Sequence, residues 1–147
     1  MTNKPKKIGT GFETAVCRYL RERLQDDRIE RRALHGSKDC GDIYGLYAHG
    51  FDGIAECKAH KSWNQPARLA EWREQTLAER ANSGAGFAVL VVKVPQRGVA
   101  ESVAHVTLRD LARVALPMMV NDGFMGEADG SWVSMTLSEL CALIDWR

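Results

Sequence analysis

A β-hairpin is predicted by the segment Gly41–Lys61, whose sequence is GDIYGLYAHGFDGIAECKAHK. Its first run, Asp42–Ala48, alternates as a strand does, and Ile54–Ala59 is the second β-rich run. The intervening HGFDG contains two glycines and supplies the turn. An acid and a base, Glu56 and Lys58, lie inside the second run, although charged side chains are rarely buried without a partner or a metal.

The hairpin is expected to bring three charged residues to one of its ends. Side chains alternate across a strand, so Glu56 and Lys58 share a face and Cys57 points to the other. If the chain folds back at HGFDG, Asp42 lies beside Glu56 and Lys58 on the antiparallel partner. Two carboxylates and an ammonium group then converge. Carboxylates bind hard cations such as Mg²⁺, which keep several waters and leave positions for phosphate oxygens.

The same charges have a simpler interpretation. An isolated Glu-x-Lys is most often a surface ion pair at the end of a strand, where it contributes little to stability. Because Asp42 lies in the preceding strand, a metal site becomes about as well supported as a surface ion pair. On the residues alone both interpretations stay open.

Helices and strands are predicted on both sides of the hairpin. Residues 11–24 have the apolar spacing of an amphipathic helix, with Thr10 as the expected N-cap. Residues 28–34 predict a polar strand, and residues 66–81 predict a helix that begins at a proline. The apolar, β-branched run 87–94 predicts a strand buried on both faces.

Two units with a shared local plan follow Pro95. Each predicts a short strand that ends at a threonine, Thr107 or Thr136, and continues as a leucine-rich helix with an acid three residues after the threonine. We therefore expect an α/β sandwich with a central mixed β-sheet flanked by helices, over residues 1–147 as a single domain.

The composition excludes several classes of protein. The chain has 147 residues, of which 45% are hydrophobic and 27% charged, which argues against disorder, collagen-like repeats and disulfide-rich miniproteins. No run approaches the ~18 apolar residues of a membrane span, and the polar N-terminus lacks a signal-peptide core, so we expect a cytoplasmic protein. The four cysteines form no CxxC pair, which favours reduced thiols over a zinc site.

Charge is unevenly distributed along the chain, although the net charge is only +1. Residues 1–38 contain ten lysines and arginines against five acids, and the balance reverses after Pro117. This asymmetry permits a basic face for a polyanion without proving one. The candidate DNA contacts are basic residues that precede or follow the hairpin motif: Lys7, Arg32, Lys38 and Lys61.

The run Asp42…Glu56-Cys57-Lys58 resembles the PD-(D/E)xK nuclease motif, with Gly41 in place of the proline. KIGTGFETAVCRYLRERL resembles the N-terminal helix of that family, which bears an acidic residue. RRALHGSKDCGDI resembles the strand, small-residue loop and Gly/Pro-Asp of archaeal-type and phage Holliday junction resolvases. The resemblance covers residues 7–94. It implies a restriction-endonuclease-like fold, with a nuclease core at 7–95 and a C-terminal β-α extension of the same domain at 96–147.

The resemblance also implies roles for individual residues. It assigns catalysis to four residues, and metal ligation to the three acids among them: Glu13, Asp42, Glu56 and Lys58. It gives supporting roles to Ser37 and to Gln75, which would touch the water or the lysine. Without the resemblance, Glu13 is more simply a helix-capping acid and Ser37 a loop residue bonded to backbone, and Gln75 is equally a solvated helix position.

The implied activity is Mg²⁺-dependent endonucleolytic cleavage of DNA, with Mn²⁺ able to substitute. A metal-activated water would hydrolyse the phosphodiester and leave a 5′-phosphate. Resolvases act in DNA recombination and repair, so four-way junctions are the expected substrate, in the host cytoplasm if a phage encodes the chain. The alternatives are a restriction- or repair-type nuclease of the same superfamily acting on duplex or flapped DNA, and a non-catalytic DNA-binding module. Thr14 stands where resolvases often have a basic residue, so the junction-specific contacts are the weaker part of the resemblance.

A homodimer is expected, because two symmetric cuts require two identical sites. Apolar residues in a stretch with few charges provide material for its interface: Met118, Met119, Phe124 and Met125.

Overall fold

The computed structural model describes residues 4–33, 38–115 and 127–145. Within these ranges it contains four α-helices and six strands. The helices are α1 (Lys4–Leu24), α2 (Pro66–Ser83), α3 (Leu108–Ala115) and α5 (Leu137–Ile144), with short 3-10 turns η1 (Val99–Glu101) and η3 (Glu127–Gly130). The strands are β1 (Glu30–Arg31), β2 (Ile43–Ala48), β3 (Phe51–Lys58), β4 (Phe87–Val92), β5 (Val103–Thr107) and β6 (Trp132–Thr136).

The six strands form one mixed sheet in which spatial order follows chain order. β3 and β4 are parallel and are joined through α2, which makes a β-α-β crossover. Every other neighbouring pair is antiparallel. This arrangement confirms the expected α/β architecture with a central mixed sheet, and the strands of the C-terminal extension continue the sheet of the core.

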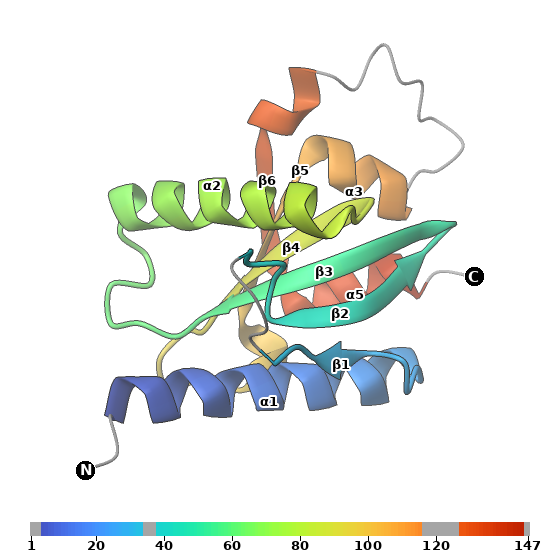
Figure 1. Ribbon diagram of the computed structural model, residues 1–147. Coiled ribbons are helices and arrows are strands. Elements are labelled where there is room, and N and C mark those ends of the chain that lie inside the picture. Colours follow the sequence, from blue (N-terminus) through green and yellow to red (C-terminus); the bar gives the residue numbers. More distant parts are fainter. Residues whose placement is uncertain (1–3, 34–37, 116–126, 146–147) are drawn as a thin grey trace.

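Helices cover both faces of the sheet (Figure 1). On one face, α1 and α5 pack with residues of β2 to β5 in the larger apolar cluster, which also includes Val114 of α3. On the other face, α2 lies over β3 and β4, where Trp72 packs with Leu90 and Val92 in a smaller cluster. Strand β4 lies at the centre and is buried along its whole length, as its β-branched sequence predicts.

The hairpin of β2 and β3 forms as predicted, with a shorter turn. β3 begins at Phe51, so only His49 and Gly50 separate the strands. Both turn residues have positive φ angles, 48° and 91°, as a type I′ connection requires. The register pairs Ile43 with Ala55, which sets Asp42 level with Glu56 at one end of the hairpin.

The predicted boundaries of two elements are wrong. Helix α1 begins at Lys4 rather than near Gly11, because Pro5 fits a first helical turn and the lysines around it favour the helix. Thr10 therefore lies inside α1, where its carbonyl accepts a hydrogen bond of 2.9 Å from the Thr14 hydroxyl. The strand predicted at 28–34 is reduced to two residues, because only Glu30 and Arg31 pair with β2.

The two C-terminal units follow the predicted plan. The Thr107 hydroxyl accepts a hydrogen bond of 3.1 Å from the backbone N–H of Asp110, and that of Thr136 accepts one of the same length from Glu139. Both helices thus begin at a threonine that satisfies an otherwise unpaired N–H group. Among the described residues, no helix combines the length and the apolar character that crossing a membrane requires.

Candidate metal centre

Strand β3 separates its charged and apolar side chains onto opposite faces of the sheet. Ala55 and Cys57 pack in the larger apolar cluster beneath α1. Glu56 lies between them in sequence and points to the α2 side, where it is only 3% exposed. This is the alternation predicted from the sequence. Glu56 is therefore an acid buried in the layer between β3 and α2.

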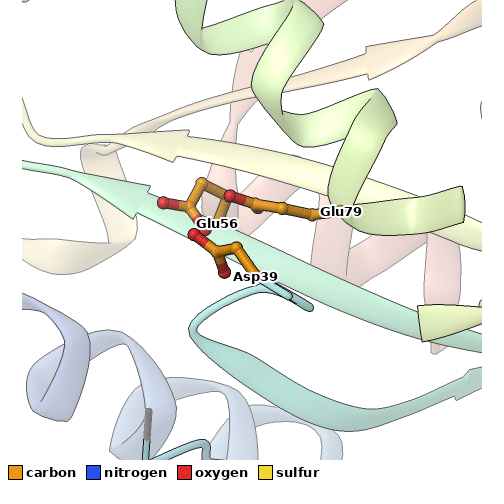
Figure 2. Close-up of side chains that lie close together, drawn as sticks. All are labelled: Asp39, Glu56 and Glu79. Carbon is orange, nitrogen blue, oxygen red and sulfur yellow. The ribbon is translucent and has the colours of Figure 1, made fainter. Parts of the chain in front are cut away.

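Three carboxyl groups from three different elements meet in this layer. They belong to Asp39 in the loop before β2, Glu56 on β3 and Glu79 on α2, and Figure 2 shows the three side chains pointing toward one another. One oxygen of each lies within 4.8 Å of the others. Oxygen atoms at such separations can share one cation, so this acidic cluster could hold a metal ion.

Hydrogen bonds hold Asp39 and Glu79 in place on either side of Glu56. Asp39 accepts a bond of 3.1 Å from the backbone N–H of Gly41, and its carbonyl accepts one of 3.0 Å from the Asn82 amide at the end of α2. The Gln75 amide donates to Glu79 Oε1 over 2.9 Å, one helical turn away. The loop before β2 is thus held against α2, and Glu79 is held over β3.

Lys58 and Asp42 border the acidic cluster at the end of β3. The Lys58 ammonium lies 3.1 Å from Glu56 Oε1, and the lysine side chain is 21% exposed. Asp42 Oδ2 accepts a hydrogen bond of 2.8 Å from the backbone N–H of Cys57. The Asp42 backbone N–H donates in turn to Ala55, over 3.0 Å. Asp42 is therefore anchored to β3 on both sides of Glu56.

Burial and mutual repulsion make the acids at this centre hard to ionise. Burial, followed by the neighbouring Glu79 and Asp42, raises the pKa of the Glu56 carboxyl group well above its ordinary value, against the opposing effect of Lys58. Burial also raises the pKa of Glu79. It raises the pKa of Asp42 as well, although the N–H of Cys57 favours the charged form. A bound cation would reverse this balance, because it competes with protons for the same oxygens.

Two oxygens of the acidic cluster are buried and, among the described residues, have no hydrogen-bond donor other than the neighbouring carboxyl groups: Oε2 of Glu56 and Oε2 of Glu79. Glu79 is 1% exposed, so its carboxyl group has no access to bulk water. A buried polar atom without a partner is costly, and native proteins satisfy nearly all of them. A set of carboxylate oxygens with unused lone pairs fits a hard divalent cation.

Three of the four predicted catalytic residues lie around β3. Glu56 and Lys58 are on the strand, and Asp42 contacts its backbone. Glu13 lies half-buried on α1, and Asp42 is the charge that most raises the pKa of its carboxyl group, after burial. Of the three predicted metal ligands, Glu56 is the one that belongs to the acidic cluster.

The predicted supporting residues have different outcomes. Gln75 points to the centre and holds Glu79. Ser37 lies outside the described residues.

The four candidate DNA contacts also differ. Lys38 and Lys61 are exposed at the surface. Arg32 is half-buried, and its guanidinium lies 4.9 Å from the centre of the Tyr44 ring. Lys7 lies within α1, but its side chain is outside the described part of the chain.

Sequence reasoning missed two members of the acidic cluster, Asp39 and Glu79. Glu79 had a detectable signal, because it follows Trp72 and Thr76 at the i, i+4, i+7 spacing of a buried helical face. A glutamate on such a face needs a partner or a ligand. Asp39 had no comparable signal, since a polar residue in a polar loop predicts only a turn.

Comparisons of the chain with family models, with curated proteins and with solved structures give no significant match. A functional assignment therefore depends on the geometry of the centre and on the resemblance in sequence.

Proposed function

We propose that the chain is a metal-dependent DNA endonuclease of the restriction-endonuclease-like fold. The observation that carries the proposal is the acidic cluster beside Lys58, in which Glu56 and Glu79 are buried and Asp39 is exposed. The motif Asp42…Glu56-Cys57-Lys58 supplies its central acid, and two further acids join from elements distant in sequence. Two of their oxygens have no donor among the described residues other than the neighbouring carboxyl groups. A surface ion pair, the simpler interpretation of Glu56 and Lys58, would not bury its acid in this way.

Each residue at the centre has a chemical task in phosphodiester hydrolysis. Asp39, Glu56 and Glu79 would hold the cation, and the hard oxygen set favours Mg²⁺, with Mn²⁺ as a substitute. When bound, such a cation lowers the pKa of a coordinated water and offsets charge on the phosphate. Lys58 can donate hydrogen bonds to a phosphate oxygen or to the attacking water. Glu56 orients that ammonium group through their contact of 3.1 Å.

The substrate and the assembly follow from the resemblance to Holliday junction resolvases. A resolvase makes two symmetric cuts in a four-way junction, which a homodimer with two identical centres can deliver. The residues suggested for its interface, from Met118 to Met125, lie outside the described part of the chain. A restriction- or repair-type nuclease on duplex or flapped DNA is the second candidate. A non-catalytic DNA-binding module is disfavoured, since it would not need an intact lysine beside buried acids.

The test is cleavage of matched DNA substrates with and without a divalent cation. The chain should nick or resolve a four-way junction in Mg²⁺ or Mn²⁺ in preference to a duplex and a flap of the same sequence, and EDTA should stop it. Glu56→Gln should abolish cleavage while leaving junction binding intact, because it removes a metal ligand and some repulsion of phosphate. The matched control is Glu74→Gln, which changes an exposed glutamate of α2 outside the cluster.

Two results would overturn the proposal. Wild-type protein that cuts none of the three substrates in either metal would exclude the nuclease activity. Full Mg²⁺-dependent activity in Glu56→Gln would exclude this centre as its site. Preference for the flap or the duplex would support the second candidate and reject the resolvase assignment.

A further inference from the structure

Two tyrosines of β2 are exposed: Tyr44 lies two residues after Asp42, and Tyr47 lies farther along the strand, opposite Asp52 of β3. Tyr44 is 36% and Tyr47 is 51% exposed, although both are large apolar rings. Ile43 and Leu46 of the same strand pack in the larger apolar cluster beneath α1. The tyrosines therefore point to the opposite face of the sheet, which is also the face that carries Glu56.

A β-bulge turns both rings to this face. In a regular strand, residues 44 and 47 would point to opposite sides. The register with β3 shifts between Ile43 and Leu46, and Gly45 has a φ of +87°. A Cβ atom at Gly45 would lie 2.2 Å from the carbonyl oxygen of Arg28, so only glycine fits this bulge. Bulges often re-aim side chains next to functional sites.

Each tyrosine ring is paired with an arginine. The Arg32 guanidinium lies 4.9 Å from the centre of the Tyr44 ring, and that of Arg28 lies 5.8 Å from the Tyr47 ring. Arg32 is also hydrogen-bonded to Asp42, which borders the acidic cluster: its backbone N–H donates to the Asp42 carbonyl over 2.7 Å. The Arg32–Tyr44 pair thus adjoins Asp42, and the Arg28–Tyr47 pair follows it along β2 toward the turn of the hairpin.

The charge of this surface favours one class of ligand. Asp26 accepts two hydrogen bonds from the Arg28 side chain, over 2.9 and 2.8 Å, and the Tyr44 hydroxyl donates to Glu30. Asp26 therefore offsets the positive charge of Arg28, and the tyrosine rings and guanidinium groups offer flat surfaces. Such groups stack on unpaired nucleobases, whereas the bases of an intact duplex are already stacked on one another.

We propose that Tyr44 and Tyr47, with Arg32 and Arg28, form a base-stacking surface for unpaired DNA nucleotides that extends along β2 from the end of the hairpin that carries Asp42. This inference rests on the proposed function, because it makes the surface part of substrate recognition. Nucleotides that are unstacked at a branch or a nick would lie on the tyrosines, and the adjoining strand would then pass the acidic cluster. The surface gives the centre a means to select distorted DNA over a regular duplex.

The test is binding of a fluorescent single-stranded oligonucleotide and of its duplex, measured by anisotropy in EDTA. Tyr44→Ala and Tyr47→Ala should each weaken single-strand binding by about tenfold, and the double variant by more, since stacking contributes substantially per base. Tyr44→Phe and Tyr47→Phe should bind within about twofold of wild type, because the ring is kept. Leu143→Ala, which removes an exposed apolar residue of α5, is the control and should change nothing.

The tyrosines are exposed, so the variants should keep the unfolding transition of the wild type, and thermal unfolding checks this. Unchanged single-strand affinity in the double alanine variant would overturn the inference. An equal loss of duplex affinity would overturn it too, as would a change in oligomeric state, which would assign the surface to a protein partner. Because no metal is present, the result is independent of cleavage. Tyrosine-dependent binding by a protein that cuts no DNA would reject the nuclease proposal alone.

Discussion

The two faces of the central sheet differ most where β3 and β4 lie side by side. On the α1 side, β3 and β4 present Ala55, Cys57, Val89 and Val91, and all four are buried in the larger apolar cluster. On the α2 side, the same two strands present Leu90 and Val92 beside Glu56, which faces Glu79. One face is a continuous core. The other face carries the acidic cluster, with Glu56 and Glu79 buried and Asp39 exposed at its margin.

The apolar face stabilises the fold. The burial of two acids on the other face does not, so it needs another explanation. Apolar burial on the α1 side contributes favourably for every side chain removed from water. Burying Glu56 and Glu79 side by side costs free energy, because their charged forms lose hydration and repel each other. A cation would remove that cost. The comparison therefore predicts opposite consequences for substitutions on the two faces.

The largest effect is expected from a core residue of the apolar face. Phe87 is fully buried and its ring lies against Gly53, where even a methyl group would clash. Phe87→Ala should lower the free energy of unfolding by about 3–5 kcal/mol, the usual range for a buried phenylalanine. Glu79→Gln, measured without metal, should leave stability unchanged or raise it, since the amide oxygen still accepts from Gln75. Urea unfolding measures both. A large loss of stability in metal-free Glu79→Gln would contradict the claim that burying Glu79 beside Glu56 costs free energy.

A smaller effect is expected from neighbours on β3 that point to opposite faces. Lys58→Ala should lower turnover by about a hundredfold at saturating DNA, the scale of lost transition-state electrostatics, with little loss of stability. Cys57→Ala should instead lower stability and leave turnover nearly unchanged, since it removes packing from the core and no group from the metal centre. The measurements are single-turnover cleavage and urea unfolding of both variants. A Lys58→Ala protein that regains the full rate at high DNA concentration would make Lys58 a binding residue.

The contrast between the faces also explains which features the sequence predicts. Regular alternation in β2 and β3, and the unbroken apolar run of β4, predict the hairpin and the central strand, because these patterns report burial directly. The same alternation places Glu56 and Lys58 correctly. The start of α1 and the shortness of β1 are not predictable in this way, since Pro5 permits an earlier start and pairing with β2 sets the strand length.

The acidic cluster depends on tertiary contacts that no local pattern encodes. Asp39 and Glu79 meet Glu56 only because α2 crosses over β3 and its last turn holds the loop before β2 through Asn82. The role assigned to Glu13 as a metal ligand comes from resemblance alone. The charges of Asp42 and Lys58 affect the pKa of its carboxyl group. Glu13 does not, however, belong to the acidic cluster, whose oxygens lie within 4.8 Å of one another.

The most gradual effect is a pH dependence of stability without metal, which accumulates with each pH unit. Burial raises the pKa of the Glu56 carboxyl group in the folded protein. Its contribution to stability is therefore complete below the unfolded pKa of about 4.3 and is lost as pH rises through the folded value. The loss is at most about 1.4 kcal/mol per pH unit for one group.

The measurement is urea unfolding of wild type and of Glu56→Gln in EDTA from pH 5 to 9. The difference between them removes the contribution of other groups, among them His105, whose pKa burial and Arg73 lower to about 4. The stability of wild type relative to Glu56→Gln should fall as pH rises. A relative stability that rises over this range would show that Glu56 is ionised and well paired without a cation.

The most direct test of the metal centre is a calorimetric titration of the purified protein with Mn²⁺ and with Mg²⁺, in the absence of DNA. Wild type should bind the cation with release of protons, because burial raises the pKa values of Glu56 and Glu79 and both must ionise to ligate it. Glu56→Gln and Glu79→Gln should each weaken binding by at least about tenfold, and Glu74→Gln should bind as wild type does. Binding that is absent from wild type, or unchanged in both cluster variants, would contradict the assignment of Asp39, Glu56 and Glu79 as a metal centre.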